Sequence, residues 1–152
     1  MSHSQLLERE LLPDDCLDST SFIDTDDDAI REISYRVAGA GEPTDRAVRI
    51  FNYVRDQVQY EFRAKLSQDE YKASRVIADG RGFCVQKAVL LSALLRAADI
   101  PAAIVLCDLK DHTLPPRIVE AMGTETMFHH GLNAIFLDNC WLLVDLHSKV
   151  TH

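Results

Sequence analysis

The sequence predicts a single domain of mixed α and β structure, with its helices first and an antiparallel pair of strands near the end. Three observations support this fold class: two early segments with apolar residues at helical spacing, a long apolar segment after a glycine-rich turn, and two alternating segments joined by Asp138-Asn139. The chain has 152 residues, of which 47% are hydrophobic, so residues 1–152 are expected to form one domain around one core.

The first 40 residues are expected to form an acidic leader and one helix. The leader is rich in aspartate and in turn-forming residues, and Thr25 or Asp26 is the predicted N-cap. The helix is predicted over residues 27–37, because Gly39 supplies the left-handed backbone conformation in which helices commonly end.

The core of the domain is expected to span residues 45–147 and to begin with a second helix over residues 45–59. Thr44 is its predicted N-cap. Apolar side chains recur at helical spacing along it, at Ala47, Ile50, Phe51, Val54 and Val58. A polar, irregular stretch follows, and then a brief helical turn over residues 73–78 leads into Gly80-Arg81-Gly82.

The segment from Phe83 to Ala98 is apolar on nearly all sides, which predicts a central helix buried in the core. Pro101 lies just beyond its end, and proline disfavours helical geometry in the residue before it. After this helix the pattern predicts a buried strand, a short helix and two more strands, over residues 102–106, 114–122, 128–137 and 141–146.

Cys84 is the first candidate for chemistry, because it lies at the predicted start of the buried helix. The first amide groups of a helix stabilise a thiolate, and the Gly80-Arg81-Gly82 turn lets the backbone present the side chain at the helix mouth. Most free cysteines are small buried hydrophobic side chains, so a functional Cys84 also needs a base and a group that orients this base.

The two C-terminal strands offer a base and an orienting carboxylate. In an alternating strand, His130 and His129 point to opposite faces. A two-residue turn at Asp138-Asn139 places His130 opposite His147 and diagonal to Asp145, on the same face. Asp145 can then accept a hydrogen bond from one ring nitrogen and leave the other to face a thiol. The alternative is a structural ion pair without chemistry.

These segments resemble the transglutaminase-like superfamily, whose pattern places a catalytic cysteine at a glycine-rich helix start, a histidine on a strand and an aspartate on the next strand. The resemblance covers roughly residues 45–147, and its matching stretches are residues 73–77, 80–88, 93–102, 130–138 and 141–145. It implies an α+β, papain-like fold in which the cysteine helix packs on an antiparallel sheet. It also implies a catalytic triad of Cys84, His130 and Asp145.

The chemistry implied by this resemblance is acyl transfer from an amide or peptide bond through a thioester on Cys84. Water as the acceptor would make the protein a hydrolase or protease, which we expect in preference to a cross-linking transglutaminase. The sequence departs from the family pattern at Gly131-Leu132, where the family has an aromatic residue after the histidine. An alternative is a catalytically silent binding module that keeps the fold, which the short segment after Asp145 favours slightly. Arylamine acetyl transfer is a third alternative, for which the sequence gives no acyl-carrier signal.

An oxyanion hole for this chemistry needs hydrogen-bond donors next to Cys84. The backbone amide of Cys84 is one expected donor, and the sequence leaves Tyr60 and Gln86 as alternatives for the second. Lys87 is expected to be a solvated surface lysine, with stabilisation of the thiolate as the less favoured alternative.

The composition argues against several classes of partner. With 24 Asp and Glu against 16 Lys and Arg, the formal charge is -8, so nucleic acid and anionic membranes would be repelled. No signal-peptide pattern or apolar run of about 18 residues is present, and we expect a cytoplasmic protein. The four cysteines lack metal-site spacing, so no metal or other cofactor is expected.

The expected partner is therefore a peptide or protein that supplies the amide bond. A sheet edge left exposed near the end of the chain would also allow pairing in a homodimer.

Overall fold

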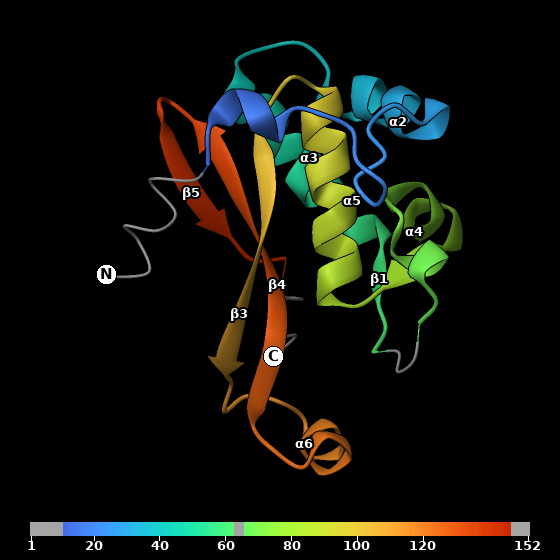
Figure 1. The fold of residues 1–152 in the computed structure, drawn as a ribbon, viewed down its shortest axis with the longest axis vertical. Helices are drawn as coiled ribbons and strands as arrows, with labels where there is room; N and C mark the ends of the chain where they lie inside the picture. The colour runs from blue at the N-terminus through green and yellow to red at the C-terminus, as the bar shows by residue number, and fades with distance from the viewer. Residues whose placement is uncertain (1–10, 63–65, 147–152) are drawn as a thin grey trace.

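The computed structural model describes residues 11–62 and 66–146. It has an α+β fold in which one long helix, α5 (Cys84–Ala97), packs against an antiparallel sheet (Figure 1). The sheet has the order β3-β4-β5 and consists of β3 (Ala102–Lys110), β4 (Thr126–Leu137) and β5 (Cys140–Val144). The α+β fold class predicted from the sequence is confirmed.

Three further helices, α2, α3 and α4, pack against α5 and enclose the core. A fourth, α6, lies at the far end of the long ribbon formed by β3 and β4 (Figure 1). These helices are α2 (Asp28–Ala38), α3 (Pro43–Gln57), α4 (Ala73–Asp79) and α6 (Pro116–Met122). The 3-10 turns are η1 (Pro13–Cys16) and η2 (Gln68–Tyr71), and the short strands β1 (Gln59–Tyr60) and β2 (Arg81–Gly82) pair in parallel.

The helix starts differ by a few residues from the predictions. Asp27, not Thr25 or Asp26, caps α2, because its carboxylate accepts the backbone N–H groups of the second and third helical residues at 2.9 and 3.2 Å. Thr44 lies inside α3, which begins at Pro43; the fixed φ of proline suits the first helical position, where no N–H is needed.

The C-terminal hairpin has the predicted register. Leu137 pairs with Cys140 across a two-residue turn in which Asp138 and Asn139 have positive φ angles of 49° and 65°. Two left-handed residues give the turn the twist that flanking strands require. Side chains alternate along the end of β4, because Ile135 and Leu137 belong to the hydrophobic core while Phe136 packs on Trp141 with ring centroids 5.3 Å apart.

The core is built around α5, whose residues from Gln86 to Arg96 are all buried. Lys87 is part of this core, since its side chain is only 1% exposed and its Nζ donates to the carbonyl oxygens of Val58 at 2.7 Å and Arg55 at 3.2 Å. The expectation of a solvated surface lysine is wrong. The last carbonyls of a helix lack internal donors, and the ammonium group supplies them at the end of α3.

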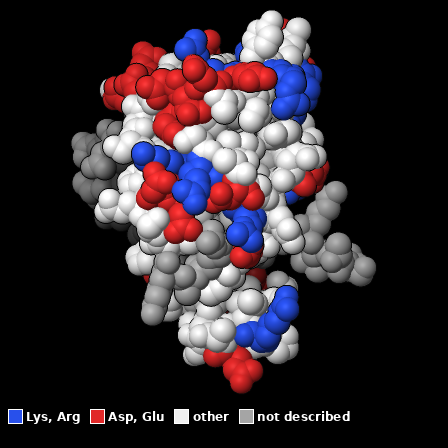
Figure 2. All heavy atoms as spheres, turned by 90° about the vertical axis from the view of Figure 1, so that its right-hand side faces the viewer, with Lys and Arg blue, Asp and Glu red and all other residues white. Residues whose placement is uncertain are grey.

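Charged side chains are mixed on the surface. On the face shown in Figure 2, acidic groups gather at one end and basic groups are interspersed with acidic ones elsewhere. Arg75, for example, forms ion pairs with Asp69 at 3.1 Å and Asp79 at 3.2 Å. None of the described helices combines the length and apolar character needed to cross a bilayer.

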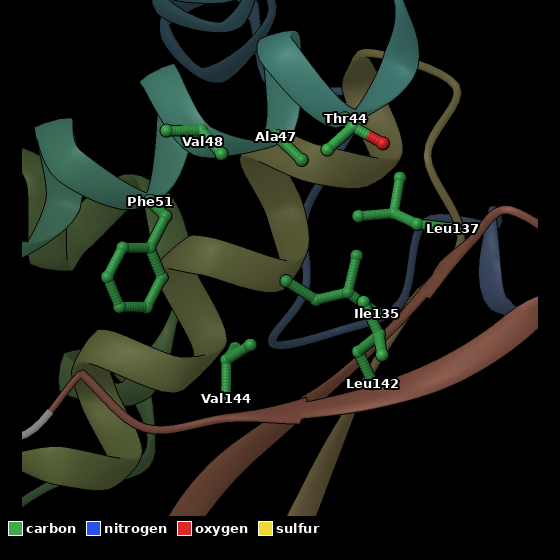
Figure 3. Close-up of a pocket in the computed structure, with 8 residues that line it drawn as sticks. All are labelled: Thr44, Ala47, Val48, Phe51, Ile135, Leu137, Leu142 and Val144. Carbon is green, nitrogen blue, oxygen red and sulfur yellow. The ribbon is translucent and has the colours of Figure 1, made fainter.

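A pocket of about 250 Å³ opens between α3 and the hairpin, and almost all its walls are hydrocarbon (Figure 3). Its lining residues are Thr44, Ala47, Val48, Phe51, Ile135, Leu137, Leu142 and Val144. None of the three predicted catalytic residues lines this pocket, so the chemistry has to be sought elsewhere.

Strand β4 comes very close to α5 at Gly131. A Cβ atom at this position would lie 2.9 Å from the Cα of Val85, which is closer than real Cβ contacts, and 3.1 Å from its backbone N. Glycine is therefore required here by space and not by its backbone angle, because Gly131 is not among the glycines with positive φ.

Replacing Gly131 with alanine is expected to lower the free energy of unfolding by about 1–3 kcal/mol, because backbone atoms of Val85 have to move. Without this contact, the same exchange would raise the free energy of unfolding by about 0.5 kcal/mol, because alanine lowers the conformational entropy of the unfolded chain. Denaturant unfolding measures the difference. Gly123→Ala is the control, since a Cβ there meets nothing within 4 Å and the variant suffers only from its left-handed backbone. A Gly131→Ala variant that is as stable as the parent would contradict this packing.

Candidate active site

Cys84 is the first residue of α5, as the sequence predicted. The chain enters the helix through Gly80, whose left-handed φ of 67° ends α4, and through the short strand β2. The thiol is partly exposed and forms no disulfide. The helix start therefore presents the sulfur at an accessible edge of the core, where unpaired N–H groups favour a thiolate.

Gln86 holds this entry in place. Its Oε1 accepts the N–H of Phe83 at 3.1 Å, and its Nε2 donates to the carbonyl oxygen of Glu70 at 2.9 Å. The side chain is 1% exposed. Because the amide is buried and both of its ends are bound inside the protein, the structure argues against Gln86 as the second oxyanion donor.

His130 and Asp145 are brought together at the end of the hairpin. The ring Nε2 donates to Asp145 Oδ2 at 3.1 Å, and the His130 side chain is 0% exposed while that of Asp145 is 35% exposed. The last paired residues of β4 and β5 are Asn133 and Val144, so this contact forms just beyond the ladder. The predicted position of His147 opposite His130 lies outside the described residues.

His129 takes no part in this contact. It is exposed, has a positive φ of 55°, and its backbone N–H donates to Asp108 Oδ1 at 3.1 Å. The register between β3 and β4 shifts between Cys107 and Leu109, beside this residue. The prediction that His130 and not His129 faces the site is consistent with this geometry.

The pKa of His130 links this ring to Cys84 as well as to Asp145. The hydrogen bond to Asp145 is the largest cause that raises the pKa of His130 to about 9, an interaction with the Cys84 side chain is the second, and burial opposes this shift only partly. The site therefore favours a protonated imidazole at neutral pH.

The pKa values of two further side chains, Tyr60 and Cys107, are affected by the charges of Cys84 and Asp145. Burial, and then the negative charges of Cys84 and Asp145, raise the pKa of Tyr60 to about 12. Cys107 pairs with His130 across β3 and β4, and its thiol pKa is raised by burial and by the carboxylate of Asp145. The sequence analysis missed Cys107, because the predicted strand stopped at residue 106 while β3 continues to Lys110.

A metal site is not formed by the described residues. Across 11–62 and 66–146, no group of three or more His, Cys, Asp or Glu side chains is arranged to hold an ion. What the described residues bring together instead is the imidazole of His130 and the carboxylate of Asp145, with the pKa of His130 also raised by Cys84.

Comparisons with known proteins place this chain in a family. The family model of the transglutaminase-like superfamily matches residues 31–146. A candidate cysteine protease from Cytophaga hutchinsonii has a similar structure, with 21% sequence identity and a TM-score of 0.69 over 90% of this chain and 43% of that chain. A search of curated protein sequences gives no significant match.

A second similar structure is the periplasmic domain of TgpA from Pseudomonas aeruginosa. It shares 19% sequence identity with a TM-score of 0.56, over 78% of this chain and 42% of that chain. The present chain thus spans less than half the length of either solved structure. The family model covers most of the sequence, and the chain belongs to the transglutaminase-like superfamily.

Proposed function

We propose that this protein is a cysteine-dependent amide hydrolase or protease with Cys84 as nucleophile, His130 as acid and base, and Asp145 as the residue that orients His130. The observation that supports this most strongly is the buried imidazole of His130, which donates to the carboxylate of Asp145 at 3.1 Å and whose pKa is raised further by the side chain of Cys84 at the start of α5. A purely structural ion pair would not require a thiol at this place.

The reaction follows from these positions. The Cys84 thiolate attacks the carbonyl carbon of an amide, and the imidazolium of His130 protonates the leaving amine as the tetrahedral intermediate collapses to a thioester. Neutral His130 then takes a proton from water, which attacks the thioester and releases the acid. A His130 pKa of about 9 keeps the required proton on the ring at neutral pH until the amine leaves.

Water is proposed as the acyl acceptor, in preference to an amine. Similar solved structures include candidate proteases from Cytophaga hutchinsonii and Parabacteroides distasonis, and this similarity supports hydrolysis. An amine acceptor would make the same site a cross-linking enzyme, because the thioester is common to both reactions.

Thiol reactivity tests the activation of Cys84. With iodoacetamide at pH 7, we expect Cys84 to be alkylated at least about tenfold faster than Cys140, although Cys140 is the more exposed thiol. Mass spectrometry of the digested protein gives the rate at each cysteine. His130→Ala is expected to remove the difference, and Cys84→Ala identifies the reactive peptide. Equal rates at Cys84 and Cys140 would favour a catalytically silent binding module.

A substrate panel tests the reaction type. Wild-type protein and Cys84→Ala are incubated with denatured proteins and fluorogenic peptide amides, with and without dansylcadaverine as an amine acceptor. New peptide termini that depend on Cys84 support hydrolysis. Incorporation of the fluorescent amine without new termini would show that water is not the acceptor.

The pH profile tests the role of Asp145. The rate of amide hydrolysis is expected to fall on the alkaline side of its pH profile near pH 9, where His130 loses its proton. Asp145→Asn removes the main cause of the raised pKa, so this limb should move to lower pH and kcat should fall by about 100-fold or more. An unchanged limb in Asp145→Asn would contradict the assignment.

The same pKa shift has a consequence for stability. The folded-state pKa of His130 lies above its ordinary value of 6.5, so its stabilising contribution is complete below about pH 6.5 and is lost as pH rises through about 9. Asp145→Asn should flatten this part of the stability profile, measured by denaturant unfolding between pH 6 and pH 10.

A further inference from the structure

The turn that leads into Cys84 is held by a second segment of chain. Strands β1 and β2 pair in parallel, with Tyr60 beside Gly82, two residues before the nucleophile. The backbone N–H of Gln59 donates to Gly80 O and that of Glu61 donates to Gly82 O, each at 3.0 Å. Hydrogen bonds on both sides of Tyr60 thus fix its backbone against the entry to α5.

This pairing places Tyr60 close to the site, because Gly82 is two residues before Cys84. The charges of Cys84 and Asp145 agree with this position, since both contribute, after burial, to the raised pKa of the Tyr60 phenol. Burial is the largest cause of the raised pKa, about 12, so the hydroxyl keeps its proton throughout the range in which the triad works. A neutral, protonated hydroxyl is a hydrogen-bond donor at any working pH.

Two other donor side chains that follow Cys84 in α5 are already bound elsewhere in the described structure. The amide of Gln86 is bound to Phe83 and Glu70, and the ammonium group of Lys87 is bound to the end of α3. A single backbone amide of Cys84 would then carry the developing negative charge alone, whereas acyl transfer usually employs at least two donors.

We propose that the hydroxyl of Tyr60 is the second donor of the oxyanion hole, beside the backbone amide of Cys84. This inference rests on the proposed function and adds a group that contacts the substrate. The hydroxyl donates its hydrogen bond to the carbonyl oxygen as the Cys84 sulfur adds to the carbonyl carbon. The bond strengthens as the oxygen becomes negative, and no proton leaves Tyr60.

Two reactions of the same sulfur separate this role from a structural one. Alkylation by iodoacetamide displaces iodide at a saturated carbon and forms no oxyanion. Acylation by p-nitrophenyl acetate passes through a tetrahedral oxyanion and releases p-nitrophenolate. A donor to the oxyanion therefore affects the second reaction and leaves the first unchanged.

The variant Tyr60→Phe is expected to slow the p-nitrophenolate burst by about 100-fold, while iodoacetamide alkylation of Cys84 stays within about twofold of the wild-type rate. Tyr71→Phe is the matched control, because the Tyr71 ring packs edge-on against Phe83, with centroids 6.0 Å apart, beside the same turn. It should leave both rates unchanged.

A burst of wild-type rate in Tyr60→Phe would overturn the oxyanion role and leave the proposed function intact. A parallel loss of alkylation and acylation would overturn it as well, since it would show that Tyr60 positions the triad. A wild-type protein with neither rapid alkylation of Cys84 nor a burst would overturn the proposed function, and this inference with it.

Discussion

The contact between β4 and the first turn of α5 is the constraint on which the site depends. A nucleophile on a helix and a base on a strand can meet only if the two backbones come unusually close, and Gly131 allows this by having no side chain. The residue before it, His130, then lies near enough to Cys84 for this side chain to raise the pKa of the ring. Any atom added at Gly131 would push the strand away from the helix and would move the imidazole away from the thiol.

Several buried polar groups keep the helix in position for this contact. Lys87 binds the end of α3, and Asn133 of β4 donates to Ala88 O at 2.8 Å and to Ser92 Oγ at 2.9 Å. Near the other end, Arg96 donates to Ala102 O at 2.8 Å and to Asp18 O at 2.7 Å. A helix held by apolar contacts alone could shift or rotate against its neighbours with little change in free energy, because such contacts have no direction. Directional bonds of this kind specify one register, because breaking one would leave a buried polar group unpaired.

Much of the fold and the proximity of the three site residues could be predicted from the sequence, because they depend on local patterns. Helical spacing located α3 and α5, and the turn at Asp138-Asn139 fixed the register that brings Asp145 near His130. Contacts between distant segments could not be predicted in this way. The burial of Lys87, the use of the Gln86 amide and the pairing of Cys107 with His130 depend on which elements become neighbours, and residue type alone does not show this.

The carboxylate that holds His130 lies one residue past the end of β5, where no ladder hydrogen bond fixes its backbone among the described pairs. Strand ends open more often than strand centres, without unfolding of the remaining core. Each such opening would release the imidazole while α5 and its sulfur stay in place. The protein would then pass through folded but chemically idle intervals, and their frequency would be set by fraying of the hairpin and not by the global free energy of unfolding.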